Sequence, residues 1–522
     1  MRSALVSDGG KAIGGLMEIY SVPQMLRAEK RSDELGVSLS ALMDNAGKAL
    51  ADEIERECVR LSVREPVILV GKGNNGGDGI VAARLLSERG FKPVTVLCCG
   101  KPSTELAIAA MKRLGDDVEV TDKASGELIC SARVLVDCIF GTGFRGEIIE
   151  ELRPLFADIE KSSAFVIACD IPSGANARNG EVSELAVRAD LTVTMHRGKL
   201  GMYLSPARYH CGEVRVCDIG IPEGTEEGCE EFENRISLYD ASVSELLPER
   251  PQWGHKGTFG RALCICGSSR YFGAAKMSCE AALRTGAGLV ELLSTEKCID
   301  ITAPESPECI YTRAGSGETL TASALPMIEE RLRGASAVLI GCGLGCSSQT
   351  EVLVKGLVEM SQVPLVIDAD GINSLCVNID VLLKKKSEVI LTPHPAELAR
   401  LCGVSVSDVM SDRVRYAAEL AGKYGVTVVS KSAETIVTNG TQSVVVQTGN
   451  TALSKGGSGD MLAGAIVSLT AQRPDKPLEN SILAALIIGE SARALSEVMS
   501  PRGIIARDIL GQIPLTLKKF ES

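Results

Sequence analysis

Histidine, aromatic residues and positive charge are scarce in this sequence. Its 522 residues include four histidines and one tryptophan, and aromatic residues make up 3% of the chain. The histidines are scattered without ligand spacing, so we do not expect a metal site built from them. Lys and Arg number 55 against 67 Asp and Glu, a net charge of −12 that argues against a surface following nucleic-acid phosphates. We therefore expect no nucleic-acid partner.

Long apolar runs and paired cysteine motifs are also missing. No stretch of about 18 apolar residues occurs, and the first thirty residues contain no apolar block followed by a small-residue cleavage site. The 18 cysteines never form a CxxC pair, so neither a disulfide scaffold nor a zinc ribbon is indicated. We expect a cytoplasmic protein without a membrane partner, whose cysteines are mostly reduced and buried.

The chain is long enough for more than one domain and has an ordinary globular composition, with 45% hydrophobic and 23% charged residues. Short apolar runs, each closed by a glycine-rich turn and followed by a helical pattern, recur over residues 66–218 and again over 261–469. This rhythm predicts α/β domains with mostly parallel sheets. We place the two domains at 1–235 and 236–522. The glutamate-rich segment 223–233 is the expected linker and is interpreted as a solvated loop.

A glycine-rich turn lies between a predicted strand and a predicted helix in the first half. Residues 66–70 read as a buried strand, 71–79 (GKGNNGGDG) as the turn and 80–89 as the helix. Glycines at such a place let backbone amides approach an anion at the helix N-terminus. The next strand, 94–98, is followed by no acid that would bind a ribose hydroxyl, which counts against an ordinary dehydrogenase.

Two more predicted strands of this half end on a carboxylate, Asp137 and Asp170. In an open parallel sheet these ends face one crevice, which would also collect oxygens from Asn74, Asn75, Asp78 and Ser173. Oxygen ligands of this kind suit a hard cation beside a phosphate-bearing ligand. The alternative for any one acid is that it caps a helix or anchors a turn.

Four motifs, GKGNNGGDG, VDCIFGTGFRG, DIPSG and VCDIGIP, closely resemble those of the NAD(P)H-hydrate epimerase domain over residues 18–225. The resemblance implies a Rossmann-like three-layer domain that interconverts the R and S hydrates at C6 of the dihydronicotinamide ring. Asp170 is then the candidate acid/base, since moving a hydroxyl requires proton transfer beside the ring. A K⁺ ion would be held by Asn75, Asp137 and Ser173. The implied substrate contacts are Asn74, Asn75, Gly76, Gly77, Asp78, Gly141, Thr142, Gly143, Phe144, Arg145, Gly146, Glu147 and Asp170.

The most informative stretch of the second half is KGGSGD, residues 455–460, which opens a predicted apolar helix over 461–469. Glycines and a serine at a helix start aim unpaired N–H groups at one point, which favours a transferring phosphoryl group or a developing anion. Asp460 adjoins that point and could accept a proton from a hydroxyl. A flexible loop is the alternative for a glycine run taken alone. His394, between two prolines, could equally be an exposed turn residue.

The segments HKGTFG, LTPHPAE and GGSGDMLAG look like those of the ADP-dependent NAD(P)H-hydrate dehydratase domain, a ribokinase-like α/β fold, over residues 245–515. By this resemblance ADP phosphorylates the C6 hydroxyl, activated by Asp460, and phosphate then leaves as NAD(P)H is restored. The implied contacts with the S hydrate are Ala274, Gly343, His394 and Asp460. The implied contacts with the nucleotide are Lys431, Ser432, Ala433, Glu434, Thr435, Gly456, Gly457, Ser458 and Gly459. Mg²⁺ is expected with the phosphoryl donor.

Taken together, these resemblances predict a fused repair enzyme. Its substrates would be NADHX and NADPHX, the hydrates of NADH and NADPH, together with ADP, and its products NAD(P)H, AMP and phosphate. We expect a homo-oligomer, although the sequence does not indicate its size. Two alternatives stay open at this point. One is a ribokinase-like vitamin or sugar kinase joined to a Rossmann-like sensor domain, and the other is a ligand-binding regulatory protein whose first domain has no catalytic role.

Overall fold

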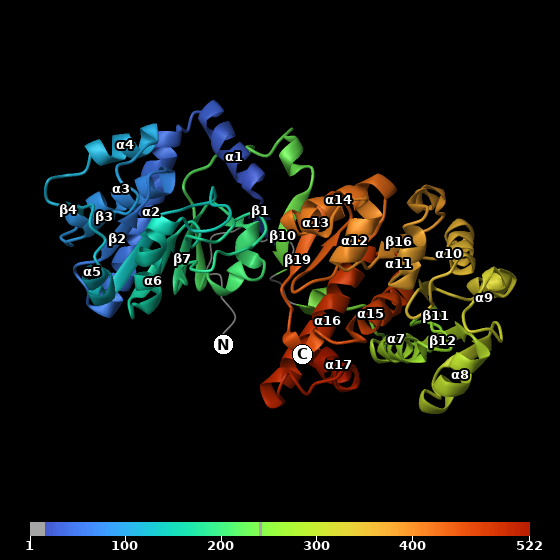
Figure 1. Cartoon of the computed structure of the whole chain (residues 1–522). Coiled ribbons are helices and arrows are strands. Elements are labelled where there is room, and N and C mark those ends of the chain that lie inside the picture. Colours follow the sequence, from blue (N-terminus) through green and yellow to red (C-terminus); the bar gives the residue numbers. More distant parts are fainter. Residues whose placement is uncertain (1–15, 240–242, 522) are drawn as a thin grey trace. The chain divides into compact units, whose positions relative to one another are not determined.

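The computed structural model describes residues 16–239 and 243–521, and the chain divides into two compact units (Figure 1). Unit 1 ends at Leu238 and unit 2 begins at Tyr239. Each unit has its own mostly parallel sheet flanked by helices, which confirms the predicted α/β class. All 18 cysteines are free thiols and most are buried, as expected. Within the described ranges, no helix combines the length and the apolar character needed to cross a membrane.

Unit 1 is built on a seven-stranded sheet with the order β4-β3-β2-β5-β6-β7-β9. All of its strand pairs are parallel. The strand order reverses between β2 and β5, which makes that position the topological switch point of the sheet. The strands are β2 (Val67–Val70), β3 (Val94–Leu97), β4 (Glu119–Thr121), β5 (Val134–Cys138), β6 (Phe165–Cys169), β7 (Leu191–Met195) and β9 (Glu213–Cys217). Three short strands lie outside this sheet: β1 (Leu16–Tyr20), β8 (Gly198–Lys199) and β10 (Arg235–Tyr239).

Alternate side chains of the strands enter two cores, one on each face of the sheet. In β2, Ile68 and Val70 belong to the core with the second and third helices, whereas Val67 and Leu69 belong to the core with the fifth and sixth. Because side chains alternate along a strand, a continuous apolar run such as VILV indicates a sheet covered on both faces. The helices are α1 (Val22–Glu34), α2 (Leu39–Leu61), α3 (Asn74–Glu88), α4 (Glu105–Lys112), α5 (Gly126–Ser131) and α6 (Arg153–Lys161). Unit 1 is therefore a three-layer domain.

Helix α3 begins at Asn74, six residues before the predicted start at residue 80. Residues 74–79 of the glycine motif thus form the first part of the helix and only residues 71–73 precede it. The glycines of the motif allow close packing. A Cβ added to Gly76 would lie 2.1 Å from the Gly71 carbonyl oxygen, and one added to Gly79 would lie 2.8 Å from Cys138 Sγ. The expectation of a turn over 71–79 is corrected accordingly. The amides at the start of α3 still face the switch point.

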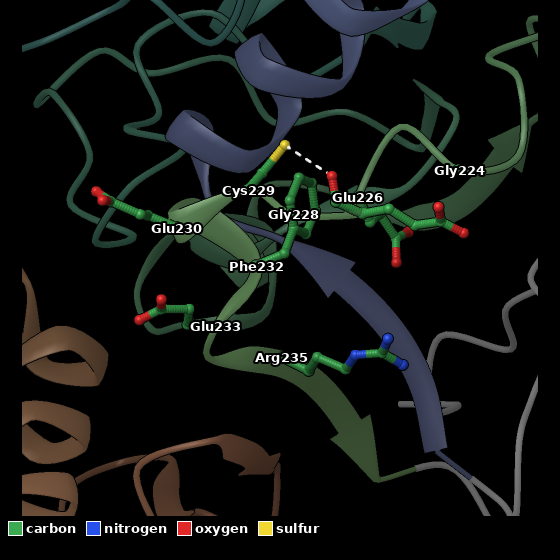
Figure 2. Close-up of a pocket in the computed structure, with 9 residues that line it drawn as sticks. Gly224, Glu226, Gly228, Cys229, Glu230, Phe232, Glu233 and Arg235 are labelled. Carbon is green, nitrogen blue, oxygen red and sulfur yellow. Dashed lines mark hydrogen bonds between the residues drawn. The ribbon is translucent and has the colours of Figure 1, made fainter.

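The prediction that residues 223–233 form a linker is wrong, because this segment is folded within unit 1 (Figure 2). Its Phe232 is buried and packs edge-on against Tyr20, with ring centroids 5.2 Å apart, and its Cys229 is buried in the same core. Glutamate composition alone suggests a solvated loop, but two apolar side chains anchor this segment. Its exposed glutamates line a shallow hollow of about 530 Å³.

Unit 2 contains a nine-strand series with the order β13-β12-β11-β14-β15-β16-β17-β18-β19. The pairs from β13 to β17 are parallel, and β18 and β19 are added antiparallel. The strands are β11 (Arg261–Ile265), β12 (Leu289–Ser294), β13 (Ile310–Arg313), β14 (Ala337–Ile340), β15 (Leu365–Ile367), β16 (Val389–Leu391), β17 (Thr427–Ser430), β18 (Thr435–Thr438) and β19 (Gln442–Val446). The C-terminal ends of β11, β14, β15 and β16 therefore share one edge.

The helices of unit 2 cover its sheet on both faces. One face carries α9 (Leu325–Leu332), α10 (Ser348–Met360), α11 (Asp370–Leu375), α12 (Pro395–Cys402), α13 (Val406–Ser411) and α14 (Arg413–Tyr424). The remaining helices are α7 (Phe272–Arg284), α8 (Glu296–Thr302), α15 (Ser458–Gln472), α16 (Pro477–Val498) and α17 (Ala506–Phe520). Helix α15 packs between α7, α16 and the sheet, and every residue from Met461 to Ala471 is buried. A helix apolar on all sides is expected to be buried in this way.

Candidate active sites

The candidate site of unit 1 centres on Asp170, the residue that follows β6. Its φ of +65° is uncommon for a residue with a side chain, and strain of this kind clusters at functional sites. The Asp170 carboxylate pairs with the ammonium group of Lys199, whose side chain is only 1% exposed. Lys199 Nζ also donates to Thr194 Oγ1 at 2.9 Å and to the Met195 carbonyl at 2.9 Å. This buried ion pair fixes the carboxylate at the carboxyl edge of the sheet.

Two further carboxyl groups, those of Asp78 and Glu29, lie close enough to the Asp170–Lys199 pair for its charges to change their pKa values. Burial raises the pKa of Asp78 well above its ordinary value, and the charges of Asp170 and Glu29 raise it further while Lys199 opposes them. Burial and Asp170 likewise raise the pKa of Glu29, which comes from α1. The site therefore combines carboxyl groups of raised pKa with a carboxylate paired to Lys199. Carboxyl groups whose pKa values are pushed apart in this way can act as the acid and the base of one reaction.

The three residues predicted to hold K⁺ lie at the ends of neighbouring elements. Asp137, which is 1% exposed, accepts hydrogen bonds from Ser173 Oγ at 2.6 Å and Ser173 N at 2.7 Å. Burial raises the pKa of Asp137 to about 6, although these hydrogen bonds act in the opposite direction. Asn75 has a buried side-chain nitrogen without a hydrogen-bond partner. Its amide lies against Gly141, where an added Cβ would be 3.2 Å from Asn75 Cγ.

The predicted substrate loop 141–147 is only partly gathered at this site. Gly141 lies beside Asn75, as described above. Arg145 folds back on its own loop and donates to the Thr142 carbonyl at 2.9 Å and the Phe144 carbonyl at 2.6 Å. Glu147 accepts hydrogen bonds from Ser183 Oγ at 2.5 Å and from the Glu184 amide at 3.2 Å, so it anchors the base of the loop.

The candidate site of unit 2 lies at the start of α15. Gly457 precedes this helix with a φ of +97°, and no side chain caps the helix. The N–H groups of the first turn are therefore available to an anion. Asp460 stands in that turn. Burial raises its pKa to about 6, and the neighbouring charge of Asp368 contributes in the same direction.

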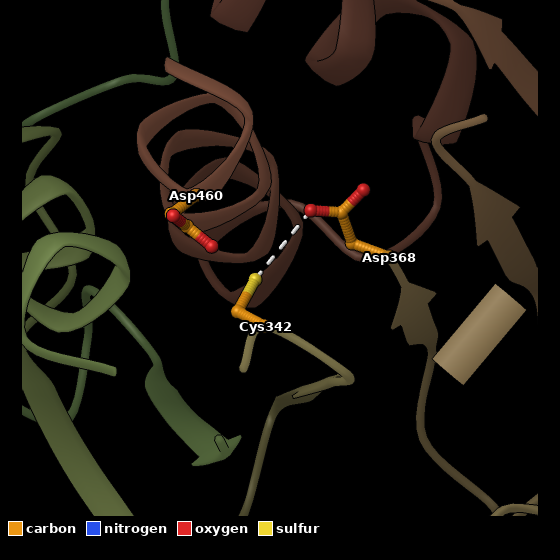
Figure 3. Close-up of side chains that lie close together, drawn as sticks. All are labelled: Cys342, Asp368 and Asp460. Carbon is orange, nitrogen blue, oxygen red and sulfur yellow. Dashed lines mark hydrogen bonds between the residues drawn. The ribbon is translucent and has the colours of Figure 1, made fainter. Parts of the chain in front are cut away.

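Asp460 faces Cys342 and Asp368, and one possible ligand atom from each of the three lies within 4.8 Å of the others (Figure 3). Asp368 follows β15 and is 1% exposed. It accepts hydrogen bonds from Lys431 Nζ at 2.6 Å and Thr392 Oγ1 at 2.6 Å, and Cys342 Sγ lies 3.5 Å away. Burial lowers the pKa of Lys431, but Asp368 and Glu397 more than compensate, so the ammonium stays charged. A buried lysine–carboxylate pair therefore stands directly beside the candidate base.

The residues predicted to contact the hydrate lie around this cluster. A Cβ added to Gly343, which has a φ of +65°, would be 2.9 Å from the Ala274 Cβ, so the two residues are in contact. His394 caps α12 through Nδ1, which accepts from the Ala396 amide at 3.1 Å. Burial lowers the pKa of His394, and the charge of Lys431 lowers it further. His394 thus lies close enough to the Asp368–Lys431 ion pair for both charges to act on its pKa.

The predicted nucleotide segment 431–435 contains residues in two different settings. Lys431 faces α15, since a Cβ added to Gly459 would lie 3.4 Å from Lys431 Nζ. Glu434 is buried, and its charge acts on the buried Arg413, whose guanidinium donates to the Ser430 carbonyl at 3.1 Å. Glu434 therefore belongs to the packing beneath the segment. Ser432 and Ala433 are exposed.

Lys199 and Asp368 are the principal site residues that the sequence analysis did not select. Asp368 carries the same signal as Asp137 and Asp170, an acid after a predicted strand, and could have been found on that basis. Lys199 has no such signal, because it meets Asp170 across 29 positions only after β8 has been placed. Glu29 likewise reaches the site from the first helix.

Known proteins match both parts of this chain. A family model described as NAD(P)H-hydrate dehydratase matches residues 262–515, and one described as the YjeF-related protein N-terminus matches residues 39–201. A bifunctional NAD(P)H-hydrate repair enzyme of Moorella thermoacetica is 33% identical, covering 94% of this chain and 94% of the relative. The Escherichia coli enzyme of the same name is also 33% identical, covering 95% and 93%. A solved NAD(P)H-hydrate dehydratase of Bacillus subtilis is 28% identical over 53% of this chain and 96% of that chain, with a TM-score of 0.46.

The near full-length matches do not favour a kinase joined to a sensor domain. They span both units in the order that the motifs predict, with the part matched by the YjeF-related N-terminal model first and the part matched by the dehydratase model second. The two resemblances seen in the sequence are therefore confirmed at the level of the family. The chain belongs to the family of bifunctional NAD(P)H-hydrate repair enzymes, in which an epimerase domain is followed by a dehydratase domain.

Proposed function

We propose that unit 1 interconverts the R and S hydrates of NADH and NADPH, and that unit 2 dehydrates the S form with ADP as phosphoryl donor. The dehydratase part of this proposal rests on the setting of Asp460. It is a carboxyl group with a pKa raised to about 6, placed in the uncapped first turn of α15. A base with a pKa near neutrality is suited to accept a proton from a hydroxyl nucleophile.

In this proposal dehydration proceeds in two steps, phosphorylation of the hydroxyl and then elimination. Asp460 accepts the proton of the C6 hydroxyl while that oxygen attacks the β-phosphorus of ADP, and AMP leaves. The amides of residues 457–459 and the ammonium of Lys431 face the charge that develops on the transferring group. The C–O bond at C6 then breaks as the lone pair of the ring nitrogen forms a C6–N1 double bond and phosphate departs, and loss of a proton from C5 to solvent forms the C5–C6 double bond and restores the dihydronicotinamide. Phosphorylation converts hydroxide, a poor leaving group, into a good one.

Epimerisation requires proton transfer beside the same ring carbon. The Asp170 carboxylate is the proposed base, and Lys199 holds it in place by a buried ion pair. Asp78, whose pKa is raised by burial and by neighbouring carboxylates, is the proposed proton donor. The remaining predicted contacts in residues 74–78 and 141–147 would bind the phosphates and ribose near the start of α3.

Two cations accompany this proposal. The oxygens of Asp137 and Ser173 and the amide of Asn75 would hold K⁺ in unit 1, because the unpartnered Asn75 amide has unmet bonding capacity and can present its oxygen when turned over. In unit 2, the Asp368 carboxylate would hold Mg²⁺ brought by the nucleotide, which leaves the neighbouring Asp460 carboxylate free to act as the base. The third group of that cluster, the Cys342 thiol, does not suit Mg²⁺. Bound Mg²⁺ would neutralise phosphate charge.

The test is a racemic hydrate supplied to the full chain with ADP, with ATP in a parallel reaction. Recovery of reduced-nicotinamide absorbance should go to completion. Asp460→Asn should abolish dehydration and leave epimerisation intact, whereas Asp170→Asn should leave the R hydrate to slow spontaneous epimerisation. Loss of both activities in either variant would refute the division of labour between the units.

The K⁺ assignment is tested separately. Epimerisation should slow when K⁺ is replaced by choline, and Asp137→Asn should remove that dependence. An unchanged K⁺ response in the variant would show that the cation is held elsewhere. A homo-oligomer in the cytoplasm stays a prediction, which size-exclusion chromatography with light scattering and cell fractionation would check.

A further inference from the structure

A hollow of about 470 Å³ lies at the carboxyl ends of β3 and β4 in unit 1 and is not used by the proposed chemistry. It is lined by Leu97, Gly100, Lys101, Val120, Thr121, Asp122 and Lys123. The two strands pair in parallel, with Val94 opposite Glu119, so both strands end at this edge. The same edge carries the start of α3 and the candidate site at Asp170.

Positive charge gathers around this hollow although the chain as a whole carries a net charge of −12. Lys72, Lys101 and Lys123 follow three neighbouring strands, β2, β3 and β4. A Cβ added to Gly100 would lie 3.9 Å from Lys72 Cε, which places the Lys72 side chain at the rim. Among the described residues, none of the three ammonium groups has an ion-pair partner. The single carboxylate of the lining is Asp122.

The topology of the sheet indicates which part of a bound dinucleotide would lie in this hollow. In an open α/β sheet a dinucleotide binds across the switch point, with its pyrophosphate at the N-terminus of the helix that follows the first strand. In unit 1 the switch point lies between β2 and β5, and Asp170 stands on the β6 side. If the damaged ring is at Asp170, the adenosine half must extend the other way, over β3 and β4. That is where the hollow lies.

The residues at the end of β3 also indicate which adenosine is preferred. An acid at this position would accept a hydrogen bond from a free ribose 2′-hydroxyl, whereas a basic residue accommodates a 2′-phosphate. Here β3 is followed by Cys98, Cys99, Gly100 and Lys101, with no acid. The apolar side chain of Val120, which is 39% exposed, offers a face for the adenine ring, with the buried Leu97 behind it in the lining.

We infer that this hollow binds the adenosine end of the substrate, and that Lys101 and Lys123 select NADPHX over NADHX by pairing with its 2′-phosphate. The inference rests on the proposed epimerase function and adds a specificity site to it. Exposed pairs of this kind are individually weak. Two of them together should account for roughly tenfold in apparent affinity.

The experiment follows epimerisation alone, using the full chain without ADP so that dehydration cannot proceed. The R hydrates of NADH and NADPH are supplied separately, and the S forms are resolved by chromatography. In the double variant Lys101→Ala, Lys123→Ala, we expect KM for NADPHX to rise about tenfold with kcat unchanged, and KM for NADHX to change less than twofold. In the unchanged chain, the KM difference between the two substrates should narrow at high salt.

The matched control is Lys92→Ala together with Lys161→Ala. Lys92 is an exposed residue that precedes β3 and Lys161 ends α6, so both lie away from the hollow. This control should leave both KM values unchanged. Equal KM changes for the two hydrates in the Lys101, Lys123 variant, or none, would overturn the lysine site. If the unchanged chain epimerised neither hydrate, the proposed epimerase function itself would fall.

Discussion

The pH dependence of dehydration should report the buried state of Asp460. The pKa of this carboxyl is raised to about 6 from the ordinary 3.8, first by burial and then by the charge of Asp368. A base is active only when ionised, so activity should be full well above pH 6 and decline below it. At pH 5, one unit below that pKa, about one tenth of Asp460 is ionised. The rate with ADP should therefore fall about tenfold between pH 8 and pH 5.

The assay measures initial rates of NADH recovery from the S hydrate and ADP between pH 5 and pH 8. Protein held at pH 5 and returned to pH 8 controls for irreversible loss. Asp370→Asn is an informative companion, because the Asp370 charge raises the pKa of Asp460 while its own carboxylate accepts from the Gly345 amide at 2.8 Å. The variant should keep that contact and move the midpoint to lower pH. A rate at pH 5 within twofold of that at pH 8, in folded protein, would refute the reasoning.

Three further outcomes are expected. Asp460→Asn should raise the melting temperature of unit 2 at pH 8, since ionising a carboxyl whose pKa is about 6 rather than 3.8 costs the folded state up to about 3 kcal/mol. The gain in melting temperature should shrink towards pH 5, where Asp460 is largely protonated in the folded chain. A gain that does not change with pH would contradict this prediction. Lys199→Met should destabilise unit 1 by about 3–5 kcal/mol and impair epimerisation, because Asp170 loses its buried partner; dehydration of the S hydrate is the internal control. Gly457→Ala should destabilise unit 2 by about 1 kcal/mol or more, since its φ is +97° and an added Cβ would meet a methionine sulfur at 2.5 Å. Gly456→Ala has no atom within 4 Å of the added Cβ and should melt unchanged.

The acids that end strands were predictable from the sequence because two local signals coincide at them. A short apolar run indicates a strand, and a polar residue immediately after it falls at the carboxyl edge of a parallel sheet. Asp137 and Asp170 were selected in this way, and Asp368 could have been. The Gly456–Asp460 stretch was accessible for a similar reason, since glycines before an apolar helix mark an uncapped N-terminus.

Predictions from local sequence were wrong where glycine or glutamate can occur in more than one kind of structure. The sequence predicts a turn over residues 71–79, but Gly76 and Gly79 lie in α3 and allow it to pack closely on Gly71 and Cys138. The glutamates of residues 223–233 suggested a linker, but Phe232 anchors that segment against Tyr20. The composition of a segment indicates its average exposure to solvent. It does not reveal that a single side chain of the segment is buried.

By itself, the sequence determined the α/β class, the order of the two domains and the strand ends where chemistry gathers. All of these follow from periodicity and from motifs contained within a few residues. Only the tertiary structure decided which charges meet, as Lys199 does with Asp170 and Lys431 with Asp368. These partners are separated by 29 and 63 positions. The physical reason is that an ion pair and a raised pKa depend on distance and burial, which exist only once the sheets and helices have packed.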